Sequence, residues 1–212
     1  MRLYAITDRR LLDGEHVKGR LSAAEREGLV RLAAKWAAMG AEYVQLREKD
    51  LPVDALTDVA GAMMEAIARR SRLLVNAGAE GAAEAARAVG AAGIHLPGRW
   101  HAEEIGRARI LGIVSVGCHS VAEVSVAKVA GADIALLSPI FPTASHPNAR
   151  PLGVEALTQA RKAAGKMPVF ALGGVNRENA GSCLAAGASG VAGIRTFLAG
   201  DWPSQAAQAM PA

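Results

Sequence analysis

Short apolar runs recur along this chain, and each ends in glycine or in a polar turn. Pro168–Leu172 runs into Gly173 and Gly174, and a second stretch covers Gly190–Arg195. Strands that are apolar on both faces belong to parallel sheets that are covered on both sides. Alanine-rich segments with helical spacing lie between such runs. This alternation predicts an α/β protein built from repeated strand–helix units.

A Gly-Ala pair precedes a strand four times, at Gly40, Gly90, Gly131 and Gly187. Each glycine stands where a helix should end, as a left-handed cap. The spacing between pairs fits two strand–helix units, so a further strand falls in each interval or before the first pair. These further strands are expected at Leu3–Thr7, Leu73–Asn76, Ile113–Gly117 and Pro168–Leu172.

Helices are expected between the strands, at 22–39, 55–69, 81–89, 101–109, 120–130, 154–164, 176–186 and 202–210. Together with the strands they predict a single (β/α)8 TIM barrel. It occupies residues 1–212 as one domain. The length of 212 residues lies at the short end for this fold.

Composition argues against several classes of protein. A hydrophobic fraction of 51% with only 4% aromatic residues indicates a core built mainly of Ala, Val, Leu and Ile. The net charge of +4 is spread without a basic run, which argues against a nucleic-acid surface. We see no membrane-spanning run and no signal-peptide core. Cys118 and Cys183 suggest neither a disulfide framework nor a metal site, so we expect a cytoplasmic protein.

Polar side chains stand at the end of the second strand, and the C-terminal strand ends carry function in such barrels. Gln45, Arg47 and Lys49 occupy alternate positions, so they share one side of the strand. Arginine offers a planar fork and lysine a point charge, which together suit a diphosphate. The competing interpretation is a solvated salt-bridge cluster with Glu48 and Asp50.

A second anion site is predicted after the seventh strand, where Gly173 and Gly174 leave backbone N–H groups with no Cβ beside them. We expect Asn176 to cap the next helix. A strand, a glycine turn and a helix N-terminus form a phosphate site in many barrels. The competing interpretation is that the glycines only make a tight turn.

Other polar positions are less specific. His95 and His119 close the fourth and fifth strands, each as an acid–base group or as a hydrogen-bonded structural residue. The longest irregular stretch follows Ser138, and stretches of that length often act as lids. Its side chains that can donate to an anion are those of Thr143, Ser145, His146 and Arg150.

Eight strings of residues, covering nearly the whole chain, carry a resemblance to a known family. They are LYAITD, YVQLREKDL, LLVN, AVGAAGIHL, VGCHS, GADIALLSPIFPTASHPNARPLG, PVFALGGV and AGASGVAGI. The chain resembles the thiamine-phosphate synthase superfamily, which includes a thiazole tautomerase branch. The resemblance implies a barrel that joins hydroxymethylpyrimidine diphosphate to a thiazole phosphate and releases pyrophosphate, with help from Mg²⁺. It implies small phosphorylated partners, without nucleic acid or membrane, and a homodimer is compatible with it.

The resemblance also implies roles for individual residues. The pyrimidine diphosphate would contact Gln45, Arg47, Lys49 and Asn76. The lid residues Thr143 and Ser145 would meet the phosphates. The thiazole phosphate would lie against Gly173, Gly174, Gly193 and Ile194. The catalytic residues expected are Arg47, Lys49 and His146, the last in place of a lysine of the family lid.

The sequence departs from the family at the metal site. Two aspartates that hold Mg²⁺ in the family are replaced by Ala77 and Trp100, and Glu80 in a short insertion is a weak substitute. Mg²⁺ requires hard oxygen ligands, so we expect it to arrive on the diphosphate. A serine of the fifth strand is Gly117, and the catalytic histidine of the tautomerase branch aligns with Pro139.

Three functions therefore stay open at this point. The first is a synthase with an altered metal site, and the second is an enzyme of a related step, such as thiazole tautomerisation. The third is a non-catalytic protein that binds thiamine precursors. The retained QLREK segment favours the first, because a pure thiazole enzyme needs no diphosphate clamp. The loss of both aspartates favours the other two.

Overall fold

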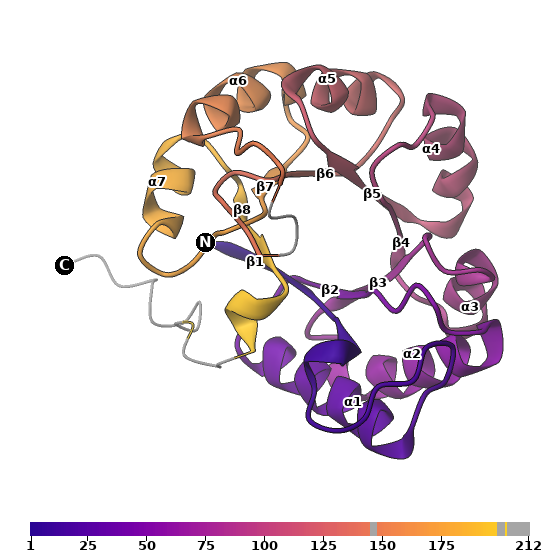
Figure 1. Cartoon of the computed structure of the whole chain (residues 1–212). Coiled ribbons are helices and arrows are strands. Elements are labelled where there is room, and N and C mark those ends of the chain that lie inside the picture. Colours follow the sequence, from indigo (N-terminus) through magenta and orange to yellow (C-terminus); the bar gives the residue numbers. More distant parts are fainter. Residues whose placement is uncertain (145–147, 199–201, 203–212) are drawn as a thin grey trace.

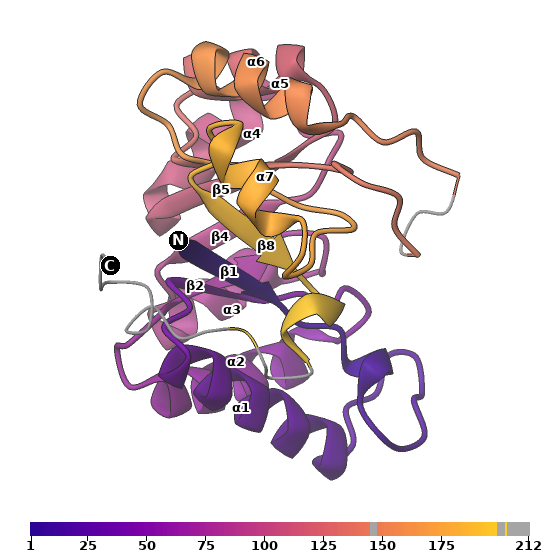
Figure 2. The ribbon, with the colours of Figure 1, turned by 90° about the vertical axis from the view of Figure 1, so that its left-hand side faces the viewer.

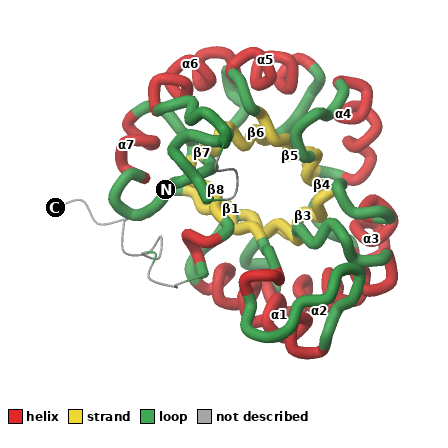
Figure 3. The backbone as a smooth tube through the Cα atoms, viewed as in Figure 1, coloured by secondary structure: helices red, strands yellow, loops and turns green. Residues whose placement is uncertain are grey.

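The chain forms one closed barrel of parallel strands. The computed structural model describes residues 1–144, 148–198 and 202. Strands β1 to β8 pair in the order of the sequence, and β8 closes the ring against β1. The described helices form a ring outside the strands (Figure 1, Figure 3). The predicted (β/α)8 barrel is confirmed.

The strands are β1 Arg2–Ile6, β2 Tyr43–Leu46, β3 Arg72–Asn76, β4 Gly93–Leu96, β5 Ile113–Cys118, β6 Ile134–Leu137, β7 Val169–Ala171 and β8 Gly190–Gly193. The α-helices are α1 Ala23–Ala38, α2 Val53–Ile67, α3 Ala82–Val89, α4 Ala102–Ala108, α5 Val121–Val129, α6 Val154–Ala164 and α7 Ala180–Ala185. Short 3₁₀ helices are η1 Arg9–Leu11, η2 Arg109–Leu111 and η3 Arg195–Phe197. None of the described helices combines the length and apolarity needed to cross a lipid bilayer.

Helix ends follow the local signals in the sequence. Ser22 and Ser120 accept hydrogen bonds from the backbone of the first turns of α1 and α5. The four repeated glycines have φ of 84° at Gly40, 65° at Gly90, 87° at Gly131 and 95° at Gly187. The left-handed conformation expected of each glycine is therefore confirmed, and it is one that other residues adopt only at a cost.

Two helix expectations need correction or lie outside the description. Helix α7 begins at Ala180, four residues later than expected, and Asn179 at its N-cap position makes no side-chain cap bond. Asn176 instead accepts from the backbone N–H groups of Glu178 and Asn179, in a turn that precedes the helix. The helix expected at 202–210 falls almost wholly outside the described residues.

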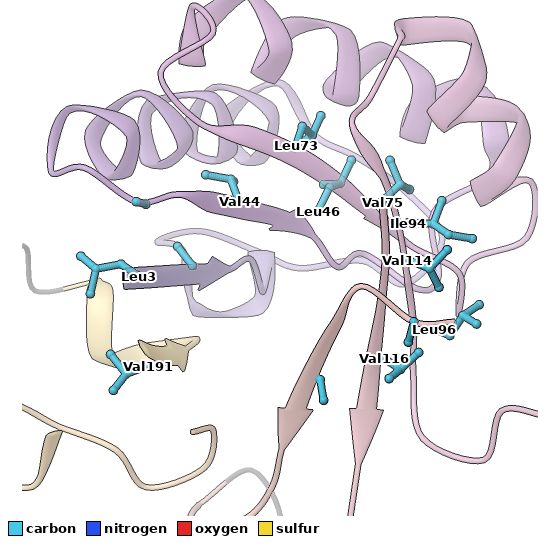
Figure 4. Close-up of a cluster of buried hydrophobic side chains, with 14 of the residues drawn as sticks. Leu3, Val44, Leu46, Leu73, Val75, Ile94, Leu96, Val114, Val116 and Val191 are labelled. Atoms are coloured by element: carbon cyan, nitrogen blue, oxygen red, sulfur yellow. The ribbon is translucent and has the colours of Figure 1, made fainter. Parts of the chain in front are cut away.

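Apolar side chains fill two layers. The larger lies between strands and helices, and its Leu, Val and Ile side chains point away from the barrel axis (Figure 4). The smaller layer lies inside the barrel and contains both tyrosines and Phe170. Their rings pack with centroids 5.4 Å apart for Tyr4–Tyr43 and 5.7 Å apart for Tyr4–Phe170. Three of the eight aromatic residues therefore lie inside the barrel, where an aliphatic core was expected, and the other five pack in or against the larger layer.

Candidate functional site

Loops at the C-terminal ends of the strands form one mouth. The segments after β1 and after β6 project beyond the same end of the barrel (Figure 2). The residues after β2, β3, β7 and β8 open onto this end, because all eight strands run in parallel. The expected site residues that the structure describes therefore share one end of the molecule.

A chain of hydrogen bonds crosses the barrel interior beneath this mouth. Asn76 Nδ2 donates to Gln45 Oε1 at 2.8 Å, and Gln45 Nε2 donates to the Tyr4 hydroxyl at 3.0 Å. Tyr4 donates to Ser115 Oγ at 3.2 Å. All four side chains are buried. The first two bonds fix the orientation of side-chain amides that would otherwise rotate, so Gln45 and Asn76 are held in place.

His95 closes this chain as a neutral residue. Its Nδ1 lies 2.9 Å from Ser115 Oγ. Since Ser115 accepts from Tyr4, its own proton can go to Nδ1, which leaves the His95 proton on Nε2. Burial lowers the pKa of His95 to about 3, helped by the charges of Lys49 and Arg47. The geometry fits the hydrogen-bonded structural interpretation better than an acid–base role near neutral pH.

Arg47 and Lys49 stand above this interior. Arg47 is half-buried, and its backbone N–H donates to Thr7 Oγ1 at 2.9 Å. Lys49 is exposed, and its stem packs beside Gly78, whose N–H donates to Asn76 Oδ1. Burial and the charges of Arg47 and Arg10 lower the pKa of Lys49. The two cations thus lie close to each other and to Asn76.

Glu48 and Asp50, the carboxylates that could have paired with Arg47 and Lys49, are bound to Arg9 instead. Buried Arg9 reaches Glu48 at 3.2 Å and Asp50 at 2.7 Å. Thr7 also donates to Glu48 at 2.6 Å, and burial raises the pKa of this carboxyl. The interpretation of Arg47 and Lys49 as partners of these two carboxylates is therefore wrong. Alternation along the strand separates the two sets, as the spacing implies.

The glycine pair packs against the loop after β6. Gly173 and Gly174 have φ of 89° and 67°. A Cβ on Gly173 would lie 2.8 Å from Pro139 Cα, and one on Gly174 would collide with the Pro142 carbonyl oxygen. The Phe141 N–H donates to Gly173 O at 3.0 Å. Glycine is thus required for the approach of a neighbouring loop, a reason that the sequence did not reveal.

The same pair leaves donors available. Within the described residues, the N–H groups of Gly173 and Gly174 donate no hydrogen bond. Gly193 at the end of β8 is buried, and Ile194 packs against the interior cluster. Asn179 Nδ2 and Thr196 Oγ1 hold the carbonyls of Gly174 and Val175. The backbone after β7 is fixed by its carbonyls while the two glycine donors remain for a ligand.

The lid residues are only partly described. Thr143 is half-buried and Arg150 is exposed. Ser145 and His146 lie outside the described residues, so their expected contacts stay predictions. His119 Nδ1 lies 2.9 Å from the carbonyl of Ser138, which ties the end of β5 to the start of the lid segment.

The positions of the missing aspartates offer little to a metal ion. Ala77 packs against the apolar core, and the Trp100 indole N–H donates to the Gly117 carbonyl at 2.7 Å. Glu80 is exposed. Over residues 1–144, 148–198 and 202, no three His, Cys, Asp or Glu side chains gather as a metal site requires. The described residues therefore do not fit a resident Mg²⁺.

Sequence reasoning missed the support beneath the site. Tyr4 and Ser115 meet across 111 residues of chain. A polar residue within an otherwise apolar strand was the available signal, since a buried hydroxyl needs a partner. Buried Arg9 was also missed, because arginine is seldom buried unless it is paired.

Comparison with known proteins identifies the family to which this chain belongs. Residues 3–197 match the family model described as thiamine monophosphate synthase. The chain belongs to the thiamine monophosphate synthase family. The match includes every described site residue discussed above and extends almost to the end of the described chain.

Relatives of this family share most of the length of the chain. A thiamine-phosphate synthase of Moorella thermoacetica is 37% identical over 76% of this chain and 76% of its own. One of Roseiflexus castenholzii is 33% identical over 98% of this chain and 86% of its own. The solved thiamine phosphate pyrophosphorylase of Pyrococcus furiosus matches with a TM-score of 0.73 at 27% identity, over 91% of this chain and 85% of that one. The thiamine-phosphate synthase resemblance is confirmed.

Proposed function

We propose that this chain is a thiamine-phosphate synthase. It would join hydroxymethylpyrimidine diphosphate to a thiazole phosphate and release pyrophosphate. The observation that carries the proposal is the convergence of Arg47, Lys49 and the fixed Asn76 at one side of the family's barrel mouth. The synthase reaction needs a clamp for two phosphates, whereas a pure thiazole enzyme does not. A cytoplasmic location and a homodimer stay predictions from the sequence.

The chemistry that these residues support is displacement of a stabilised leaving group. The bond between the pyrimidine methylene carbon and the diphosphate oxygen breaks, and its electron pair leaves with pyrophosphate. The thiazole nitrogen then forms the new bond to that carbon. Arg47 and Lys49 would stabilise the charge that develops on the leaving oxygens, and Gln45 would orient the pyrimidine. No step requires His95 to gain a proton.

The second phosphate would occupy the other side of the mouth. The N–H groups of Gly173 and Gly174, which donate to no described residue, suit a monophosphate, as at other barrel phosphate sites. Thr143, Gly193 and Ile194 border this side, and we keep Ser145 and His146 as lid contacts. Two anion sites at one mouth would hold the two rings side by side, which supplies much of the rate enhancement in such reactions.

Magnesium does not fit as a resident ion. We propose that any Mg²⁺ is carried by the diphosphate, since the described side chains supply no carboxylate cluster. The tautomerase alternative gains no support, because Pro139 stands at the position of that branch's histidine and packs against Gly173.

The test is incubation of the purified protein with both substrates, each substrate alone, and both with a chelator or with added Mg²⁺. Formation of thiamine phosphate only when both substrates are present is the expected result. A folded protein that forms no thiamine phosphate at any Mg²⁺ concentration would refute the proposal. Conversion of the thiazole tautomer without coupling would identify the tautomerase instead.

A further inference from the structure

A charged pocket extends the diphosphate side of the mouth toward the segment after β1. Its volume is about 290 Å³. The residues that line it are Asp8, Arg10, His16, Lys18, Arg47, Glu48, Lys49 and Asp50. The resemblance assigns only Arg47 and Lys49 of these to the substrate, so the contribution of the β1 side is unassigned.

Asp8 holds Arg10 in this pocket. Arg10 Nε donates to Asp8 Oδ1 at 2.7 Å, and Nη2 donates to Oδ2 at 2.6 Å. Asp8 Oδ2, the oxygen that accepts from Arg10 Nη2, also lies 3.9 Å from Arg47 Nη1. One carboxylate therefore places two guanidinium groups side by side. Among the described residues, Arg10 uses only these two side-chain N–H groups of its five, so three remain for an anion.

Lys49 adds a third positive charge with no partner. It forms no hydrogen bond or ion pair with any residue of the described chain. Arg47 and Arg10 both lower its pKa, so each lies within electrostatic reach of the ammonium group. Glu48 and Asp50 line the same pocket, but both are bound to Arg9. Asp8 binds Arg10 and lies near Arg47, whereas Glu48 and Asp50 act on Arg10 only at longer range, so the positive charge of the cluster is only partly balanced.

This cluster lies beside the place where the family's metal ligands are missing. Lys49 packs beside Gly78, two residues after Asn76 and one after Ala77. A diphosphate carries several negative charges, which either cations or a metal ion must balance. Four Lys and Arg side chains line this pocket, and the described residues contain no cluster of carboxylates that could hold a metal ion.

We propose that Arg10, oriented by Asp8, is a third cationic contact to the diphosphate, and that Arg10, Arg47 and Lys49 bind this group without a resident metal ion. The inference rests on the proposed function and deepens it. It adds the segment after β1 to the substrate site, and it makes diphosphate binding by the free protein independent of Mg²⁺.

Titration calorimetry with inorganic pyrophosphate, once with EDTA and once with MgCl₂, tests the proposal. The expected result is binding in EDTA, weakened about tenfold to a hundredfold by Arg10→Ala. Arg10→Lys should fall between, since it keeps the charge but loses the fork. The matched control is Arg31→Ala, which removes the same charge from an exposed pair with Glu27 on α1 and should change affinity less than about twofold.

Two results would overturn the inference. One is pyrophosphate binding that appears only when Mg²⁺ is added. The other is equal affinity in Arg10→Ala and Arg31→Ala, with both variants folded by circular dichroism. If thiamine phosphate forms despite either result, the proposed function stands and this inference fails. If pyrophosphate binds through Arg10 but no thiamine phosphate forms, the site stands and the reaction does not.

Discussion

The two sides of the barrel mouth are built from different parts of the chain. After β2 and β3, long side chains converge, and a buried hydrogen-bond chain fixes those at its base. After β7, two glycines offer backbone N–H groups, and their carbonyls and the adjoining loop fix them. Single substitutions can alter the first side one charge at a time. The second side depends on backbone shape, which tolerates little change.

This difference explains where the chain departs from its family. The side-chain half carries Ala77 and Trp100 where the resemblance implies aspartates, and it contains the cationic pocket around Arg10. The backbone half retains its glycine pair, because a Cβ on either glycine would meet the loop after β6. We infer that substitutions can redistribute charge on the side-chain half of the mouth, whereas packing against the loop after β6 fixes the backbone of the glycine half.

The largest expected effect belongs to the backbone side. Gly174→Ala would force φ of 67° on a residue with a Cβ and push that Cβ into Pro142 and Phe141. The strain alone is about 1–3 kcal/mol, and displacement of the donors should weaken thiazole-phosphate binding by about a hundredfold. Calorimetry measures this. Gly181→Ala is the control, since its Cβ would meet nothing within 4 Å. Unchanged binding in Gly174→Ala would show that this backbone does not hold the phosphate.

A smaller loss is expected on the side-chain half. Arg47→Ala should weaken hydroxymethylpyrimidine diphosphate binding by about 1.5–3 kcal/mol, through loss of a charge-assisted contact. Thiazole-phosphate binding should change by less than about threefold, because the ligands occupy different sides. Parallel titrations with the two ligands provide the comparison. Equal weakening of both would erase the division between the two sides.

The pH dependence of stability probes the buried support. His95 stays neutral when folded, with its pKa lowered to about 3, whereas an unfolded histidine takes up a proton below a pKa of about 6.5. Stability from His95 is therefore complete above about pH 6.5 and is lost as pH falls toward 3. Between pH 7 and 5 the loss should be about 2 kcal/mol. The free energy of unfolding, measured with urea at each pH, should depend less on pH in His95→Gln than in the wild type. Identical slopes would mean that His95 is protonated in the fold.

The smallest effect concerns the metal. Ala77→Asp places one carboxylate beside Asn76, so half-maximal activity should need about two- to tenfold less Mg²⁺ if the local backbone keeps the family geometry. Rates measured across a Mg²⁺ titration compare the variant with the wild type. Tight Mg²⁺ binding to the ligand-free wild type would instead show that Glu80 or another carboxylate already acts as a ligand of the metal ion.

The repeated glycines and apolar runs predicted the barrel because each signal is local. Two-residue alternation also placed Gln45 and Arg47 correctly apart from Glu48. Contacts between distant segments were beyond such signals. The bond from Tyr4 to Ser115 depends on strand register around the closed barrel. The requirement for glycine at position 174 depends on the path of the neighbouring loop after β6. Asn176 makes the side-chain contacts expected of a cap, but only the turn geometry shows that the helix itself begins later, at Ala180.

A crystal structure with thiazole phosphate and pyrophosphate bound together tests the division of the mouth most directly. We predict the monophosphate within hydrogen-bond distance of the N–H groups of Gly173 and Gly174. We predict pyrophosphate against Arg47, Lys49 and Arg10. Both anions on one side, or a monophosphate bound away from the glycines, would contradict the account.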